Sequence, residues 1–405
     1  LTGERPRFTL DPALHQGRYY VQDPSSMLTA VVVEHITEKL GRDDLIYVDV
    51  CAAPGGKTTA AIDALGDDAL VIANEHDHKR VGALIENLAK WGAPNVVITE
   101  NDGRKIGVLG AIADVVAADV PCSGEGMMRK DSDAVEQWSQ RLVAECAELQ
   151  REIVASAWKL LKPGGYFIYS TCTFNRQENE ENVEWMISEL GAESMELPAL
   201  HGKIAGAIGS DIHAARFIPG RVNGEGLFMA LLRKPGEWTP TPEDSKTVRP
   251  AKELKAVEQW LRQGAVYSLE VTPDGRVCAL PSRYGRLIGR IRSKLNVKTA
   301  GVNIASQKGK AYQPTQQYAL SPLCRTETDG KPFAGKAEVD YPQAIAYLRG
   351  EAITIDAPRG MVVLTYNDMP LGVVNNLGNR ANNRYPGGWA IKTTHVPDSF
   401  APLVK

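Results

Sequence analysis

Two cysteines and an acid stand at the ends of two apolar stretches that follow one another along the chain. Asp119 closes the apolar run 112–118, and Cys122 follows it directly after a proline. A proline fixes the backbone, so the thiol sits on a stiff turn. Cys172 ends the second run, 166–170. Short apolar runs that lead into polar residues are typical of buried parallel strands, which deliver side chains to one edge of a sheet. The pattern predicts chemistry that uses two thiols and a carboxylate.

Apolar runs and amphipathic stretches alternate around these positions and predict an α/β fold. Strands are expected over residues 45–50, 69–74, 96–100, 112–119 and 166–170, and helices over 58–65, 78–91, 134–161 and 179–190. This alternation is typical of a doubly wound, Rossmann-like parallel sheet, whose ligands bind at the carboxyl ends of the strands. An antiparallel hairpin over 217–234 is expected to close the sheet.

The turn after the first expected strand reads Cys51-Ala52-Ala53-Pro54-Gly55-Gly56-Lys57. Its end is similar to the end of a P-loop, and Asp119 is similar to the acid that holds Mg²⁺ in P-loop enzymes. The full motif needs a glycine where Cys51 stands, and Pro54 lacks one of the N–H groups that wrap a phosphate. The glycine pattern of nicotinamide-binding enzymes is absent too. A tight glycine turn therefore predicts an adenosine ligand without phosphates.

Each of the next three expected strands is also followed or ended by an acid, at the same edge of the sheet as this turn. Glu75 comes after the second strand, where a carboxylate can accept both ribose hydroxyls. Asp102 follows the third strand, where it could accept from the adenine amino group, and Asp119 ends the fourth. A surface acid explains any one of them alone, but three in register favour a binding site.

The composition is that of a globular chain without a membrane span. The sequence has 405 residues, 43% of them hydrophobic and 23% charged, with a net charge of −3. These values predict two or three domains, and bulk charge cannot be the source of nucleic-acid binding. Six cysteines lack the spacing of a disulfide framework, which is typical of a reducing cytoplasm. The histidines form no metal-ligand pattern, and no metal is expected.

The amino-acid composition of the sequence changes after residue 234. Prolines among Thr, Glu and Ser over 235–250 are typical of a linker, and short strand-like runs beyond it predict β-rich modules. The span 281–318 holds no acid and eight basic residues: Arg283, Arg286, Arg290, Arg292, Lys294, Lys298, Lys308 and Lys310. This pattern favours contacts with RNA phosphates over a merely solvated face. The segment 379–389 adds amides and aromatic rings of the kind that contact single-stranded bases.

Three motifs resemble those of the Sun/Fmu family of RNA cytosine-5 methyltransferases, namely the turn 51–57, the stretch 119–124 and the stretch 170–173. The tail is similar to the RNA-binding modules, related to the PUA fold, of bacterial small-subunit rRNA methyltransferases, on residues 347–350 and 386–388. The resemblance implies a Rossmann-like, S-adenosylmethionine-dependent methyltransferase domain followed by a small β-rich, PUA-like RNA-binding region.

The resemblance also implies a mechanism. S-adenosyl-L-methionine supplies the methyl group, and a thiolate that adds to cytosine C6 raises the electron density at C5, which is covalent catalysis. By resemblance, Cys172 is the nucleophile and Cys122 assists release; the residues alone leave the order of the two thiols open. Asp119 can hold the N3/N4 edge when protonated or accept from the N4 amine when ionised. Lys57 can lower the pKa of a neighbouring thiol or bind a carboxylate. The target base must be unstacked or flipped into the cleft.

Cofactor contacts are expected from the turn and from the acids at the strand ends: Cys51, Ala52, Ala53, Pro54, Gly55, Gly56, Lys57, Glu75, Asp102 and Asp119. The predicted organisation is a remnant N-terminal segment packing on the catalytic domain (1–40), the methyltransferase domain (41–234), a linker (235–250), a first C-terminal RNA-binding module (251–330) and a PUA-like RNA-binding module (331–405).

The predicted function is methylation of cytosine C5 in 16S rRNA by a cytoplasmic, monomeric enzyme without a membrane or metal partner. One alternative is a cytosine-5 methyltransferase that acts on tRNA. Another is a non-catalytic RNA-binding factor for ribosome assembly on the same fold, against which the pair Cys122 and Cys172 counts, because a scaffold has no need of both thiols.

Overall fold

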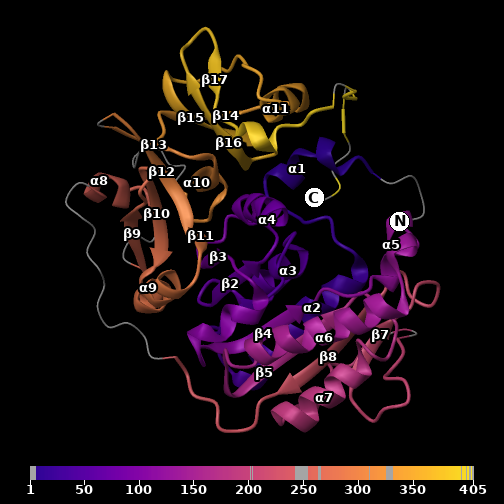
Figure 1. The fold of residues 1–405 in the computed structure, drawn as a ribbon. Coiled ribbons are helices and arrows are strands. Elements are labelled where there is room, and N and C mark those ends of the chain that lie inside the picture. The colour runs from indigo at the N-terminus through magenta and orange to yellow at the C-terminus, as the bar shows by residue number, and fades with distance from the viewer. Residues whose placement is uncertain are drawn as a thin grey trace.

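The computed structural model describes residues 6–200, 202, 204–241, 254–262, 266–309, 311–324, 332–393, 395–397, 399–400 and 403. Figure 1 shows a large lower part that holds the main sheet, with two smaller β-rich parts beside and above it. No helix among the described residues is long and apolar enough to span a bilayer.

The main sheet has nine strands in the order β11-β3-β2-β1-β4-β5-β8-β6, with β7 paired to β8. Its parallel centre consists of β1 (Ile46–Asp49), β2 (Leu70–Glu75), β3 (Val96–Glu100), β4 (Ala113–Asp119) and β5 (Leu161–Thr171). Antiparallel strands extend it, namely β6 (Glu193–Met195), β7 (Ala214–Phe217), β8 (Leu227–Arg233) and β11 (Val297–Ala300). The predicted Rossmann-like fold is confirmed.

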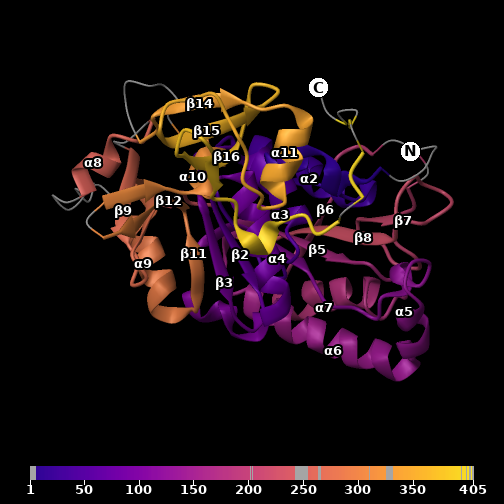
Figure 2. The ribbon, with the colours of Figure 1, turned by 90° about the horizontal axis from the view of Figure 1, so that it is seen from above.

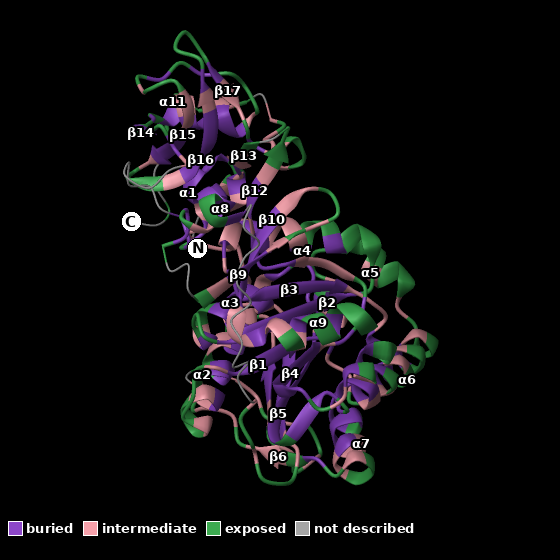
Figure 3. Cartoon of the chain, turned by 90° about the vertical axis from the view of Figure 1, so that its left-hand side faces the viewer, coloured by how far each residue is buried: buried purple, intermediate pink, exposed green. Residues whose placement is uncertain are grey.

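Helices cover both faces of this sheet, which is why its central strands are continuous apolar runs. One core joins the sheet to α6 (Gln140–Ala157), α7 (Glu180–Leu190) and α9 (Gly285–Lys294). The other joins it to α2 (Leu28–Leu40), α3 (Gly56–Leu65) and α4 (His78–Trp91). Figure 3 shows the buried residues concentrated along the strands and the exposed residues on the outer faces of the helices.

Two smaller sheets follow, and Figure 2 shows them on one side of the main sheet. The first contains β9 (Tyr267–Val271), β10 (Arg276–Pro281), β12 (Val302–Lys308) and β13 (Ala311–Pro314), with α8 (Lys255–Glu258) and α10 (Gln316–Leu320). The second contains β14 (Gly335–Glu338), β15 (Gly360–Tyr366), β16 (Met369–Asn376) and β17 (Ala381–Asn383), with α11 (Tyr341–Leu348).

Three expected elements differ from the structure. The helix expected over 134–161 is two helices, α5 (Ser132–Gln137) and α6, because Trp138 is extended and the Ser139 side chain caps α6 by accepting from the Leu142 N–H. The strand expected from 166 begins at Leu161, since the glycines 164 and 165 let it bend across a register shift. The hairpin expected over 217–234 is present, but its first strand is β7, which ends at Phe217.

One strand crosses the predicted domain boundary. Residues 297–300 belong to the span assigned to the first C-terminal module, yet as β11 they pair antiparallel with β3 of the main sheet. A run that reads Val-Lys-Thr-Ala carries no apolar signal for this pairing. The N-terminal segment also bridges two parts, since α1 (Pro12–His15) packs on α11 and the Gln16 amide donates to the carbonyls of Tyr366 and Met369, both at 2.8 Å.

Most of the basic side chains of this stretch interact with protein groups, although Arg290, Arg292 and Lys294 are also exposed to solvent. Four side chains bind the methyltransferase domain: Arg283 pairs with Asp44 and Asp68, Arg290 donates to the Leu109 carbonyl, Lys294 to the Val108 carbonyl, and Lys298 pairs with Glu100. Arg292 pairs with Glu270 of β9, and Lys310 lies outside the described residues. These five charges therefore hold parts of the chain together, which the absence of acids within 281–318 could not show.

The segment 379–389 is also used internally. Tyr385 is buried and its hydroxyl meets His15 Nδ1 at 2.9 Å, while the Asn383 amide donates to two carbonyls of the same module. Burial lowers the pKa of His15 to about 4, so this contact is between neutral groups near neutrality. Trp389 stacks under the Lys90 ammonium at 5.5 Å.

We predict that Arg216→Met destabilises the fold by about 3–5 kcal/mol, because it leaves the fully buried Glu180 carboxylate without its cation. Urea unfolding measures the change. Arg141→Ala is the matched control, since its pair with Glu145 is exposed, and no measurable change is expected. Equal losses for both variants would contradict the assignment of a buried ion pair.

Candidate active site

The turn 51–57 lies between β1 and α3 and is shaped by buried contacts on both sides. The Thr58 hydroxyl donates to the Asp49 carboxylate at 2.7 Å, which ties the first turn of α3 to the end of β1. Burial raises the pKa of Asp49 to about 7. Gly55 has a φ of 111°, a left-handed conformation that favours glycine. A Cβ on Gly56 would lie 3.0 Å from the Tyr20 ring, so this glycine lets the ring approach closely.

The acids expected to hold the adenosine lie at neighbouring strand ends. Glu75 is buried, and its carboxylate accepts from the backbone N–H groups of His76 at 2.8 Å, Asp77 at 2.9 Å and Ala53 at 3.3 Å. It therefore touches the turn directly. Asp102 binds the Arg104 guanidinium at 2.7 Å, and this hydrogen bond lowers the pKa of Asp102 to about 2. Both stay predicted cofactor ligands.

Lys57 and Asp119 join the turn to the end of β4. Their side chains are 2.7 Å apart, and the second Asp119 oxygen accepts from the Ser170 hydroxyl at 2.9 Å. Burial opposes the charge on Lys57, but Asp119 outweighs it and the pKa of Lys57 is raised. The structure thus brings a permanent cation and a carboxylate to the place where the two thiols lie.

The sulfur atoms of Cys122 and Cys172 are 3.1 Å apart, within hydrogen-bonding distance. The hydrogen bond from Cys122 lowers the pKa of Cys172, and the charge of Lys57 acts in the same direction. The same bond, with burial, raises the pKa of Cys122. Cys172 is therefore the thiol that ionises more readily, and Cys122 is the one that keeps its proton. Burial raises the pKa of Cys51, which suits a packing role under the turn.

A cavity of about 220 Å³ opens above the turn. It is lined by Tyr20, Val21, Gln22, Asp23, Ser26, Cys51, Ala52, Ala53, Pro54, Gly56, Lys57 and Asp119. The Gln22 Nε2 is buried and has no hydrogen-bond partner among the described residues. An orphaned donor beside a glycine turn fits a polar ligand such as the amino-acid end of S-adenosylmethionine.

The sequence did not single out residues 20–26 as part of this site. Much of that stretch is polar, and Asp23 caps the turn Pro24–Met27 by accepting from the Ser25 N–H at 2.9 Å. In the sequence, the amide of Gln22 is the one feature of this stretch that suggests ligand binding. A single amide is a weak signal, because the sequence does not show that Gln22 lies over the turn 51–57.

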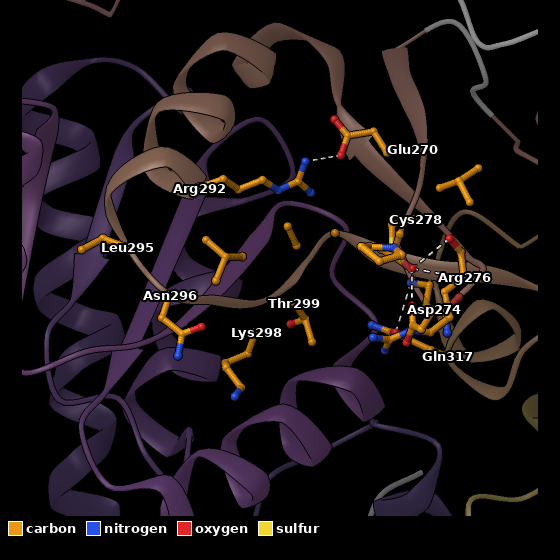
Figure 4. Close-up of a pocket in the computed structure, with 17 residues that line it drawn as sticks. Glu270, Asp274, Arg276, Cys278, Arg292, Leu295, Asn296, Lys298, Thr299 and Gln317 are labelled. Atoms are coloured by element: carbon orange, nitrogen blue, oxygen red, sulfur yellow. Dashed lines mark hydrogen bonds and ion pairs between the residues drawn. The ribbon is translucent and has the colours of Figure 1, made fainter.

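A larger cavity, of about 580 Å³, lies between β9, β11 and β12 (Figure 4). Its charged side chains pair among themselves or with neighbours: Arg292 with Glu270, Arg276 with Asp274 and Lys298 with Glu100. None of the predicted site residues lines it. Within the described residues, no group of three His, Cys, Asp or Glu side chains is placed to hold a metal ion.

Comparison with known proteins decides the family. A family model described as 16S rRNA methyltransferase RsmB/F matches residues 38–233, and one described as methyltransferase RsmF PUA domain matches residues 334–391. Ribosomal RNA small subunit methyltransferase F of Shewanella amazonensis is 31% identical over 390 residues, which cover 92% of this chain and 79% of the relative. This chain belongs to the RsmB/F methyltransferase family.

A second curated relative agrees with this placement, and a solved structure is similar to part of the chain. Ribosomal RNA small subunit methyltransferase F of Pectobacterium atrosepticum is 32% identical over 397 residues, which cover 91% of this chain and 77% of the relative. A solved structure described as NSun6 from Pyrococcus horikoshii with SFG is 33% identical, with a TM-score of 0.49 over 56% of this chain and 55% of that chain. The RsmB/F chain described here is thus an S-adenosylmethionine-dependent methyltransferase with a C-terminal PUA domain, as the motifs predicted.

We predict that Cys172 is alkylated by iodoacetamide at lower pH than Cys122, because the hydrogen bond between them lowers the pKa of Cys172 and raises that of Cys122. Cys122→Ala should remove the donor and move the midpoint of Cys172 alkylation to higher pH. Peptide mass spectrometry measures both rates. Cys146, whose pKa burial raises to about 11, is the internal control and should not respond. A midpoint that stays or falls would overturn this electrostatic account.

We further expect S-adenosylmethionine to bind without Mg²⁺ and Glu75→Ala to weaken it roughly ten- to a hundredfold, the cost of losing a charged hydrogen-bond acceptor. Isothermal calorimetry gives the affinities. Asp67→Asn, in the exposed turn between α3 and β2 at the opposite edge of the sheet, is the control and should bind normally. ATP binding of similar strength that requires Mg²⁺ would instead support a P-loop.

Proposed function

We propose that this enzyme methylates C5 of a cytosine in 16S rRNA through a covalent bond between Cys172 and C6, and that Cys122 assists release. The observation that carries the proposal is the pair of thiols 3.1 Å apart beside Lys57 and Asp119. A methyltransferase that acts on a nucleophilic oxygen or nitrogen has no use for two adjacent thiols, whereas cytosine C5 must first be made nucleophilic.

The order in which bonds form and break follows from this arrangement. Cys172, as a thiolate, adds to C6, and the electron pair of the C5–C6 double bond moves toward C5 and the ring. S-adenosylmethionine, when bound, offers an electrophilic methyl group to C5. A base then removes the C5 proton, the double bond re-forms and the sulfur of Cys172 leaves as thiolate. Cys122, whose raised pKa keeps its proton in place, can donate a hydrogen bond to that thiolate and so stabilise the leaving sulfur.

Asp119 is suited to orient the base. Both of its oxygens already act as acceptors, one from the Lys57 ammonium at 2.7 Å and the other from the Ser170 hydroxyl at 2.9 Å. An ionised carboxylate accepts a hydrogen bond from the exocyclic N4 amine of cytosine but cannot donate to N3. This supports one of the two roles that the sequence left open, and it favours cytosine over uracil, which carries a carbonyl at that position.

The choice of 16S rRNA rests on the names of the relatives and on the PUA domain. Exposed arginines of that domain are available for phosphates, namely Arg359, Arg380 and Arg384. They add to the exposed side chains of the basic stretch, which stay predicted RNA contacts: Arg286, Arg290, Arg292, Lys294 and Lys308.

We predict that Cys172→Ala abolishes both methylation and any covalent RNA adduct, whereas Cys122→Ala still adds to the base and leaves RNA trapped on the protein. Radiolabelled 16S rRNA fragments with S-adenosylmethionine, run on a denaturing gel, show the adduct as a shifted band. tRNA run in parallel should give no band. A band with Cys172→Ala and none with Cys122→Ala would reverse the two roles, and turnover without an adduct in both would exclude the covalent route.

A further inference from the structure

The two thiols lie on separate loops, beyond the last residues that the hydrogen bonds of the sheet connect. The Cys122 loop (residues 120–126) leaves β4, and the Cys172 loop (residues 172–178) leaves β5. Beyond the ends of the strands, a single backbone hydrogen bond joins the two loops, from the Gly126 N–H to the Cys172 carbonyl at 2.8 Å, as far as the described residues show. The short distance between the sulfurs therefore needs another source.

Glu125, on the Cys122 loop, binds the backbone of the other loop. One oxygen accepts from the N–H groups of Phe174 at 2.8 Å and Asn175 at 2.9 Å. The second oxygen accepts from the Trp138 indole at 3.1 Å and from the Asn175 amide at 3.3 Å. Burial opposes its charge, but these donors outweigh burial and lower the pKa of Glu125.

Glu178, on the Cys172 loop, makes the reciprocal contact. Its side chain is fully buried, and one oxygen accepts from the Ser123 N–H at 3.0 Å and from Gln150 Nε2 at 2.8 Å. The other oxygen accepts from the Asn175 amide at 2.6 Å. Ser123 directly follows Cys122, so this carboxylate holds the peptide next to the thiol. Asn175 contacts both carboxylates and joins the two contacts into one network.

We propose that Glu125 and Glu178 are positioning residues that set the separation of the Cys122 and Cys172 sulfurs, each by holding the loop that carries the other thiol. Neither carboxylate needs to touch RNA or cofactor for this role. A carboxylate that accepts three or four hydrogen bonds in a buried setting fixes its donors more tightly than a neutral acceptor does. Glutamine in its place would turn an NH₂ group toward a donor and leave at least one N–H unsatisfied.

A short bifunctional thiol reagent measures the separation without RNA or cofactor. Peptide mass spectrometry gives the ratio of Cys122–Cys172 cross-link to single modification, which cancels changes in the reactivity of the first thiol. Glu178→Gln is expected to lower this ratio on the order of tenfold, since a shift of about 1 Å costs at least that much in a proximity-dependent step. Glu125→Gln, at a half-buried position, is the milder variant should the first fail to fold.

Asp114→Asn is the matched control. Asp114 is a buried carboxylate at the start of β4, where it accepts from the Ile46 N–H, Lys162 and the Trp238 indole. This variant should lose stability in a thermal melt while its cross-link ratio stays at the wild-type value. A wild-type ratio in both glutamine variants, together with lowered melting temperatures, would overturn the proposal and leave the two carboxylates as ordinary structural groups.

A second readout rests on the proposed function. If Cys122 assists release, Glu178→Gln should raise the fraction of RNA trapped as adduct, toward the level of Cys122→Ala, while the affinity for S-adenosylmethionine stays unchanged. Absence of an adduct in Cys122→Ala itself would count against the proposed mechanism only, because the cross-link ratio tests the positioning role independently. A normal adduct fraction in Glu178→Gln, beside a trapped Cys122→Ala, would count against the positioning role.

Discussion

The parallel register of β4 and β5 is the constraint on which the site depends. It places Asp119 opposite Ser170. On the loops that follow, Cys122 comes three residues after Asp119 and Cys172 two residues after Ser170. Because successive side chains of a strand point to opposite faces, a slip of one residue would invert every contact of β5. Both faces oppose such a slip. Phe167 and Tyr169 lie in one core while Tyr166 and Ile168 lie in the other, so neither pair can exchange sides without repacking a whole core.

The ion pair between Lys57 and Asp119 links the turn 51–57 to the end of β4. Lys57 belongs to the turn that is expected to hold the cofactor, and Asp119 belongs to the strand that delivers the first thiol. In the proposed mechanism, this one contact sets where the methyl group and the target base meet. It also keeps a positive charge near Cys172, which favours its thiolate, while Asp119 opposes that effect. The net lowering of the pKa of Cys172 depends on the hydrogen bond from Cys122, so in the proposed mechanism the second thiol affects the attack as well as the release.

The parts of this structure that sequence could predict are those encoded locally. β3 and α4 have the predicted bounds, because a buried strand reads as an unbroken apolar run and a helix with a capping Asp77 and a terminal Gly92 marks its own ends. The three motifs located the thiols, Asp119, Lys57 and the turn. β11 escaped prediction because its pairing partner is nearly two hundred residues away. Glu125 and Glu178 escaped for a related reason, since an acid in a loop gives no sign of the backbone that it will bind.

The basic stretch shows the same limit for charge. Counting Lys and Arg over 281–318 identifies a strong potential but not its partner, and the partners of Arg283 and Lys298 are acids of the methyltransferase domain. These pairs have a consequence for RNA binding. Together with β11 in the main sheet, and with Gly92 packed closely against the Leu320 carbonyl, they join the C-terminal parts to the methyltransferase domain over an extended surface. Under the proposed function, this joint would present RNA bound by the C-terminal parts at a fixed distance from Cys172, so that the spacing between the RNA-binding surface and the target base would itself select the site that is methylated.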